Sequence, residues 1–219
     1  MNGRRRSRRR RLFITLLSLF LVTSFGVYQF AGPLLGHARL GDCSVLVDGE
    51  IKYLNVADTQ VLVADAIGGK KDLGRATISC SYSPIDRTDS QSILDSGLTQ
   101  RAEEMRARIK NTFGKIAYGG YAPGGVDSGH IPGSAHYEGR AIDYFFRPYD
   151  NPEKKQSGWR LAQWAVVHAD ELSINTIIYD DKIWTRQSSW LGWREYTHPS
   201  GNTDNPILRH LDHVHLDVN

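Results

Sequence analysis

The hydrophobic pattern begins with one long apolar stretch. Residues 12–36 contain no charged side chain, and a helix of that length, rising about 1.5 Å per residue, spans a bilayer core of about 30 Å. The preceding residues 1–11 contain seven Arg and no acidic residue, which predicts a cytoplasmic tail by the positive-inside rule. We therefore expect a transmembrane anchor at 12–36, with the C-terminal remainder outside the cytoplasm. A cleaved signal segment, giving a secreted protein, is the alternative.

Residues 37–80 have the pattern of a small extracytoplasmic module. Alternating apolar positions on either side of Asp48-Gly49 predict a β-hairpin over residues 43–56. Residues 59–69 fit a short helix ending at a Gly pair better than they fit a strand. The polar and turn-rich residues 81–97 predict a linker to the next domain.

Residues 98–219 show the alternating helix and strand patterns of an α+β domain. Apolar positions recur every three or four residues over 98–113, and a second helix is predicted over 159–172. Segments rich in β-branched and aromatic residues predict strands at 115–120, 140–146, 174–180, 182–186 and 213–218. The expected fold is a small antiparallel sheet with flanking helices.

The chain has two cysteines, Cys43 and Cys80, and both follow the apolar segment. In an oxidising compartment we expect a disulfide between them, with two separate buried thiols as the alternative. The bond would close a loop of 36 intervening residues, which the chain-entropy treatment values at about 3–4 kcal/mol.

The charge distribution excludes one class of partner. The chain carries a formal net charge of +3, and removing the seven Arg of the tail leaves −4 for residues 12–219. A mildly acidic body does not have the basic surface that nucleic-acid binding requires. We therefore expect no nucleic-acid partner.

Histidines gather near the C-terminus. Four of the eight lie within the last 22 residues. In a strand, successive side chains point to opposite faces, so His213, His215 and Asp217 share one face of the terminal strand. The apolar residues between them face the core. Two imidazoles side by side on a non-core face can meet a metal or a substrate, although a solvated polar face gives the same pattern.

A carboxylate inside an apolar strand adds to this pattern. Asp143 lies within residues 140–146, and a buried carboxylate without a partner is costly. The partner is either Arg140 or Arg147 in a salt bridge, or a metal ion. One carboxylate oxygen and two imidazole nitrogens suit zinc, and three protein ligands leave a fourth position for water, as in catalytic sites.

The spacing of these residues resembles that of the LAS metallopeptidases, the family of lysostaphin, D-Ala-D-Ala peptidases and sonic hedgehog. The pattern is SxHxxGxAxD followed by a late HxH, and its elements are Ser134, His136, Gly139, Ala141, Asp143, His213 and His215. The resemblance covers about residues 98–219 and is closest in character to actinobacterial secreted domains. It implies a hedgehog/DD-peptidase-like fold and a Zn²⁺ ion bound by His136, Asp143 and His215. It also implies hydrolysis of peptide bonds in peptidoglycan stems or crosslinks, often next to a D-amino acid.

The same resemblance leaves the general base open. Some members place a Glu three residues before the last zinc ligand, where this chain has Asp212. Others use a histidine two residues before that ligand and another further upstream, here His213 and His210. Strand alternation puts His213 on the face of the ligands and Asp212 on the opposite face. We therefore expect His213 to act as the base, with Asp212 second and His210 as a helper.

One departure from the family pattern concerns the group that stabilises the oxyanion. Members often carry Arg in a GGYRP-like run, and this chain has Ala122 at that place. Arg140 or His130 could substitute. The departure supports an alternative function, a catalytically weak or inactive zinc domain that binds the cell wall or a protein partner. For a peptidase we expect substrate contacts from Ser134, Arg140, Trp190 and Trp193.

Overall fold

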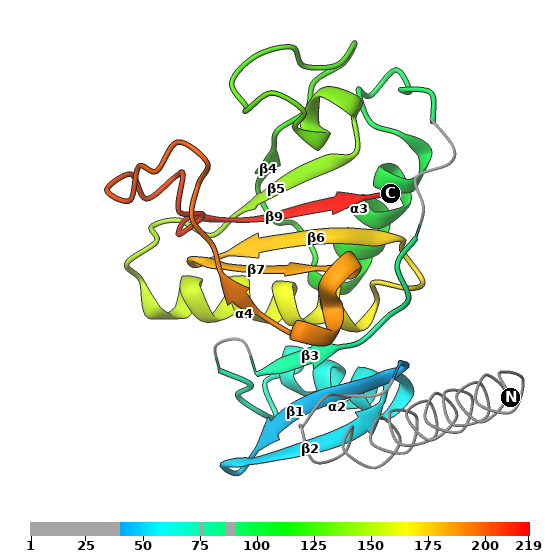
Figure 1. Cartoon of the computed structure of the whole chain (residues 1–219), viewed down its shortest axis with the longest axis vertical. Coiled ribbons are helices and arrows are strands. Elements are labelled where there is room, and N and C mark those ends of the chain that lie inside the picture. Colours follow the sequence, from blue (N-terminus) through cyan, green and yellow to red (C-terminus); the bar gives the residue numbers. More distant parts are fainter. Residues whose placement is uncertain (1–39, 75–76, 86–90) are drawn as a thin grey trace, which may run out of the picture. The chain divides into compact units, whose positions relative to one another are not determined.

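A computed structural model describes residues 40–74, 77–85 and 91–219 of the 219-residue chain (Figure 1). Residues Ala38–Asn219 form one compact unit. The predicted Arg-rich tail and the predicted anchor at 12–36 lie outside the described residues. Within the described ranges, no helix combines the length and apolar character needed to cross a membrane.

The first elements form a small antiparallel sheet, as the hairpin pattern predicts. Strands β1 (Asp42–Val47), β2 (Glu50–Asn55) and β3 (Ile78–Cys80) lie in the order β2-β1-β3. The turn between β1 and β2 uses Asp48 and Gly49, both at positive φ, which matches the twist of a two-residue hairpin. Cys43 and Cys80 are paired positions on β1 and β3 and form the predicted disulfide.

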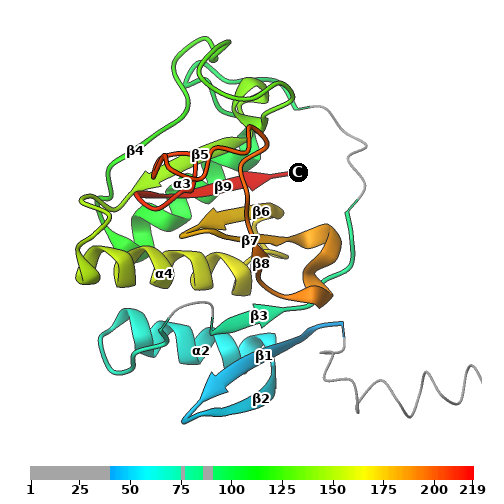
Figure 2. The ribbon, with the colours of Figure 1, turned by 60° about the vertical axis from the view of Figure 1, so that its left-hand side comes forward.

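Helix α2 (Val56–Ile67) follows β2 directly. It begins three residues earlier than predicted because the Asn55 side chain accepts a hydrogen bond from the backbone N–H of Asp58 and caps the helix. Helix α2 and strand β3 contact helix α4 of the larger domain (Figure 2). Tyr82, inside the predicted linker, is buried, and its hydroxyl donates to the carbonyl of Val167.

The second sheet is antiparallel throughout and has six strands in the order β4-β5-β9-β6-β7-β8. Their bounds are Tyr118–Gly119 for β4, Ala141–Phe145 for β5, Ile174–Tyr179 for β6, Lys182–Thr185 for β7, Arg194–Glu195 for β8 and His213–Val218 for β9. The C-terminal strand β9 therefore lies in the interior of the sheet, between β5 and β6 (Figure 1). The predicted α+β class is confirmed.

Helices α3 (Gln100–Phe113) and α4 (Pro152–Val167) pack against this sheet and against each other. The rings of Phe113 and Trp164 meet edge to face with centroids 5.6 Å apart. Helix α4 begins seven residues before the predicted start at 159, because the Asn151 side chain caps it and a Pro occupies its first position. It ends at Val167, short of the predicted 172.

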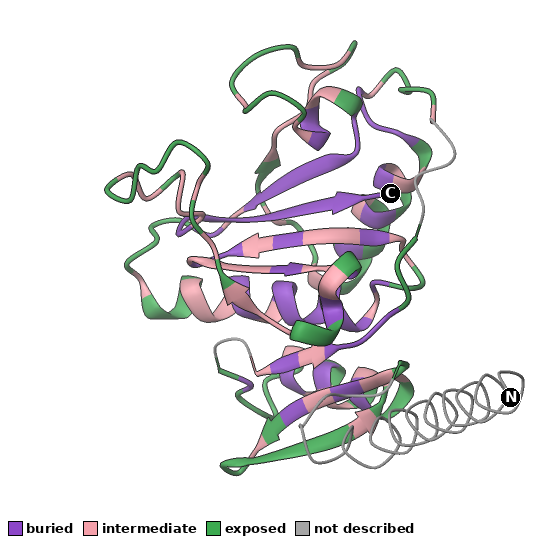
Figure 3. Ribbon diagram, in the orientation of Figure 1, coloured by how far each residue is buried: buried purple, intermediate pink, exposed green. Residues whose placement is uncertain are grey.

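Strand β9 has one apolar and one polar face, as its alternation predicts. Val214, Leu216 and Val218 are fully buried in the core. His213, His215 and Asp217 point to the other face, yet each is only 5–9% exposed. Figure 3 shows β9 buried along its whole length. The polar face of β9 is therefore an enclosed polar region and not a solvated surface.

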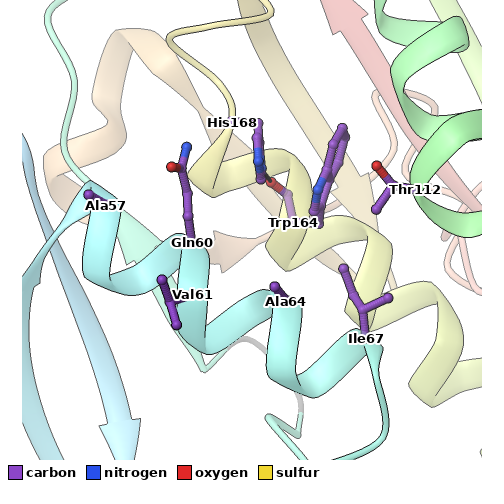
Figure 4. A pocket seen from close by; sticks show the side chains of 8 residues that line it. All are labelled: Ala57, Gln60, Val61, Ala64, Ile67, Thr112, Trp164 and His168. Carbon is purple, nitrogen blue, oxygen red and sulfur yellow. Dashed lines mark hydrogen bonds between the residues drawn. The ribbon is translucent and has the colours of Figure 1, made fainter.

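A pocket of about 400 Å³ lies between α2, which packs on the small sheet, and α4, which packs on the six-stranded sheet (Figure 4). Its lining is mostly apolar, with the stacked rings of Trp164 and His168 on one side. The lining residues are Ala57, Gln60, Val61, Ala64, Ile67, Thr112, Trp164 and His168. None of the histidines or carboxylates of the polar face of β9 belongs to it.

We predict that the disulfide supplies much of the stability of the small sheet. Replacing Cys43 and Cys80 together by Ser removes a cross-link between positions 37 residues apart, which should lower the free energy of unfolding by about 3–4 kcal/mol. Urea denaturation of the full chain measures this. Reductant should destabilise the parent protein by a similar amount and leave the double variant unchanged; equal stability of the parent and the variant would contradict the prediction.

Candidate metal centre

Three elements place a carboxylate and two imidazoles at one point. Asp143 on β5 and His215 on β9 are direct partners in the antiparallel register, so their side chains project from the same face of the sheet. His136 comes from η1 (Ala135–Glu138), the short 3₁₀ helix that leads into β5. The site is thus built where the sequence motif and the terminal strand meet.

Two positions of the motif, Ser134 and Gly139, shape η1. The hydroxyl of Ser134 accepts a hydrogen bond from the backbone N–H of His136 at 3.4 Å and caps the short helix. Gly139 ends it in the left-handed conformation at φ 64°. A side chain there would also lie 2.7 Å from the carbonyl oxygen of Gly97, so both the conformation and the space favour Gly.

The three candidate ligand atoms converge closely. The distance from His136 Nε2 to His215 Nδ1 is 3.1 Å, and Asp143 Oδ1 lies 3.3 Å from the former and 3.1 Å from the latter. Ligand atoms about 2.0–2.2 Å from a tetrahedral zinc are about 3.3–3.6 Å apart. The observed separations of 3.1–3.3 Å are at or slightly below that range, and the buried trio His136, Asp143 and His215 could hold a metal ion.

In both histidines, the ring nitrogen that points away from the site contacts a polar group. Nδ1 of His136 donates to the carbonyl of Gly120 at 2.7 Å, and because a carbonyl only accepts, Nε2 keeps its lone pair for the site. Nε2 of His215 lies 3.5 Å from Asp217 Oδ2, whose other oxygen accepts from Asn175. Partners of this kind orient and fix the tautomer of metal-binding histidines.

The electrostatics of the trio favour a cation. Burial alone would raise the pKa of Asp143, but its contacts with His136 and His215 hold it well below its usual value. Burial would lower the pKa of His215, yet the carboxylates of Asp143 and Asp217 raise it to about 9. Without a metal, the ring of His215 therefore keeps a proton between the carboxylates of Asp143 and Asp217. A bound divalent ion would replace that positive charge.

His213 lies two residues before His215 on the same face of β9 and also points toward the three candidate ligands. Its Nε2 lies 3.9 Å from Asp143 Oδ1, and its Nδ1 donates to Asp212 Oδ1 at 2.8 Å. Asp212 also accepts from the guanidinium of Arg147 at 2.7 Å. Although burial would raise the pKa of Asp212, these hydrogen bonds lower it.

His210 completes the group of rings. Its ring centroid lies 4.5 Å from that of His213 and 5.9 Å from that of His215. The residue has a positive φ of 54°, and its carbonyl accepts from the backbone N–H of Asp180 at 2.8 Å. Burial, with the neighbouring imidazoles, lowers the pKa of His210 well below its usual value, so this ring is neutral.

The other residues expected near the substrate have separate positions. Arg140 is buried and binds Glu138 and the carbonyl of Val218. Trp193 stacks edge to face on Trp159, and its indole donates to the carbonyl of Ile78 in β3. Trp190 is 53% exposed. The contacts described for Arg140 and Trp193 are with residues outside the histidine cluster.

The salt-bridge alternative for Asp143 does not hold in the structure. Arg147 pairs with Asp212 and Arg140 pairs with Glu138, while Asp143 pairs with histidines. His130 instead stacks on His136, with ring centroids 3.9 Å apart. Its backbone is fixed by the hydroxyl of Tyr137, which accepts from its N–H and donates to its carbonyl.

Sequence reasoning did not predict the contacts by which three groups support the site. These are the carbonyl of Gly120, the Asp217 carboxylate and the Arg147 guanidinium. Asp217 had a signal, since it shares the face of His213 and His215. The other two depend on how loops and strand ends meet, which no local pattern in the sequence reveals.

Comparison with known families gives one match. A family model described as "VldE, C-terminal domain" matches residues 94–207, slightly more than half of the chain. The matched range includes His136 and Asp143 and ends before His215. No curated protein and no solved structure matches the chain.

We predict that Gly120→Ala weakens metal binding. A methyl group at this position would lie 2.4 Å from Cε1 and 2.6 Å from Nδ1 of His136, so the ring must move and lose its hydrogen bond to the Gly120 carbonyl. Disturbing such a partner typically costs about 10–100-fold in metal affinity. Titration of the metal-depleted full chain with Zn²⁺ measures this.

Gly124→Ala is the matched control. Gly124 has a φ of 82°, close to the 85° of Gly120, but a methyl group there meets nothing within 4 Å. Both variants place a side chain at a similar positive φ, and only one crowds His136. Equal zinc affinity in the two variants would show that the crowding has no effect.

Proposed function

The chain belongs to the VldE C-terminal domain family, and from the geometry of the cluster we propose that it is a zinc-dependent peptidase. We propose that it hydrolyses peptide bonds of peptidoglycan stems or crosslinks, in particular bonds next to a D-amino acid. The enzyme would be of the DD-carboxypeptidase or endopeptidase type. The resemblance of its motifs to the LAS metallopeptidases supports the choice of substrate.

One observation carries the proposal. His136 Nε2, Asp143 Oδ1 and His215 Nδ1 lie within 3.3 Å of one another, and they come from two separate regions of the sequence. The donor set of two imidazoles and one carboxylate supports Zn²⁺, and three protein ligands are typical of catalytic rather than structural zinc sites. The described residues offer no free cysteine for a closed structural site.

These three residues would hold the ion, and bound Zn²⁺ supplies a Lewis acid that polarises a carbonyl oxygen and makes a water molecule more acidic. Gly120 and Asp217 engage the other nitrogens of His136 and His215, so with the ion bound each ring would direct the lone pair of its remaining nitrogen to it. The remaining work of the protein is to move a proton and to orient the peptide.

His213 is the group best placed to move that proton. Its Nδ1 is committed to Asp212, so Nε2, the nitrogen nearer Asp143, is free to accept a proton from the attacking water. The same nitrogen can then give the proton to the leaving amine. Asp212 is less suited to be the base, because His213 and Arg147 already occupy its two oxygens. His210, neutral and beside His213, would assist in binding the peptide.

The setting fits an enzyme of the bacterial envelope. The disulfide between Cys43 and Cys80 is typical of an oxidising compartment. A single-pass N-terminal helix would anchor the chain in the cell membrane, with the zinc domain outside and peptidoglycan or a peptide as its partner; release after signal cleavage is the alternative. Trp190, which is largely exposed, remains a candidate substrate contact.

A non-enzymatic role is the second candidate. Ala122 stands where related enzymes often carry Arg, and Arg140 is engaged by Glu138 and Val218. A zinc domain without an oxyanion group would bind the cell wall or a protein partner without cutting it. His130, stacked on His136, is the nearest replacement donor for a peptidase.

We predict that the zinc-loaded full chain cleaves purified muropeptides and that mass spectrometry identifies the shortened products. His213→Gln should reduce kcat by about 10²–10⁴-fold, because it removes the proton carrier, while the zinc content stays unchanged. Asp143→Ala should lose both the metal and the activity.

Two results would count against this scheme. Intact muropeptides after incubation with the zinc-loaded parent protein, together with sedimentation of the protein on cell-wall sacculi, would establish the binding role instead. Full activity in His213→Gln would assign the proton transfer to another residue.

A further inference from the structure

Arg147 is connected to the metal centre through two hydrogen bonds in series. Its Nε donates to Asp212 Oδ2 at 2.7 Å. The other oxygen of that carboxylate accepts from His213 Nδ1 at 2.8 Å. At the far side of the same imidazole ring, Nε2 faces Asp143 Oδ1 at 3.9 Å. The chain of contacts therefore runs from an exposed arginine to the centre of the site.

The sheet brings the members of this chain together. Phe145 and His213 are paired in the register of β5 and β9. One position further, the backbone N–H of Phe146 donates to the carbonyl of Asp212 at 2.8 Å. Arg147 thus follows the end of β5 beside the residue that precedes β9, Asp212. The backbone pairing of the two strands therefore places the two side chains close together.

The Arg147 side chain also packs on an aromatic ring. Its guanidinium lies over the ring of Phe145, with 4.1 Å from Cζ to the ring centroid. The planar guanidinium can stack and donate in its plane at the same time, which an ammonium group cannot do. More than half of the side chain is exposed, so this arrangement is specific in geometry without being part of the core.

Asp212 needs this partner to hold one orientation. The residue is only 4% exposed, and a buried carboxylate requires hydrogen bonds to both oxygens. With Arg147 in place, one oxygen is reserved for the guanidinium and the other for Nδ1 of His213. Without it, the carboxylate can rotate, and the His213 ring loses the contact that selects its tautomer.

We propose that Arg147 is a positioning residue that acts through Asp212 on His213. It keeps the proton of His213 on Nδ1 and leaves the Nε2 lone pair directed at the metal centre. The effect on catalysis rests on the proposed function, because it requires His213 to carry a proton during peptide hydrolysis. The effect on the tautomer does not depend on any activity.

The direct test is ¹⁵N NMR of the full chain labelled at its histidines, with the His213 signals assigned from a His213→Gln sample. In the parent protein, the neutral ring of His213 should be the Nδ1–H tautomer, because Nδ1 donates to Asp212. Arg147→Ala should show a mixture of the two tautomers. Arg147→Lys, which retains the positive charge and can still donate from its ammonium group, should restore the Nδ1 form in part.

Kinetics supply the second readout. Arg147→Ala should lower kcat on muropeptides by about 10–100-fold with KM changed less than about twofold, because the proton carrier is misplaced while the binding surface is intact. Zinc content should not change, which separates this variant from those of the metal ligands.

Arg106→Ala is the matched control. Arg106 pairs with Glu103 and lies over the ring of Tyr118, so it has the same two kinds of contact in a position on α3 away from the histidines. It should keep the parent kcat and the parent tautomer. A change in Arg106→Ala equal to that in Arg147→Ala would assign both effects to general destabilisation and overturn the proposal.

The outcomes for the two proposals are separable. If the parent protein leaves muropeptides intact but Arg147→Ala still mixes the His213 tautomers, peptidase function fails and the positioning role stands. If Arg147→Ala keeps a pure Nδ1 tautomer, the positioning role is wrong, whatever the activity of the parent protein.

Discussion

The structure depends on the pairing of one buried carboxylate with two buried imidazoles. Asp143 and His215 face each other across adjacent strands, and His136 reaches them from the short helix that precedes β5. The carboxylates of Asp143 and Asp217 raise the pKa of His215, so without a cation the imidazole between them retains a proton. Groups that are costly to bury are thus gathered where a divalent ion would satisfy all of them.

The surrounding fold serves to hold that geometry. The apolar side of β9 lies fully buried in the core, so the register of the central strands cannot slip without exposing Val214 and Leu216. The loop at Gly120 orients His136 through its backbone carbonyl. It approaches the ring so closely that only Gly fits there. Arg147 holds Asp212 by a hydrogen bond, and Asp212 in turn orients the ring of His213. Strands β5 and β9 carry two of the ligands and η1 carries the third, and the groups that orient them come from a loop at Gly120 and from β9 at Asp217.

Much of this arrangement is encoded locally and was predictable. Strand alternation identified the shared face of His213 and His215, and the Asp48-Gly49 turn and the disulfide cysteines were correctly assigned. The starts of α2 and α4 were missed because the caps Asn55 and Asn151 lie outside the apolar periodicity. The hydrogen bond to the Gly120 carbonyl and the ion pair of Arg147 arise only from tertiary contacts, which no sequence window contains.

The most direct test of the account is the metal content of the full chain after loading with Zn²⁺ and removal of the excess. Elemental analysis should find one zinc per chain in the parent protein and none in Asp143→Ala, whereas Asp212→Ala should still bind one. A parent protein that retains no zinc, or an Asp143→Ala variant that retains a full equivalent, would contradict the assignment of His136, Asp143 and His215 as a metal site.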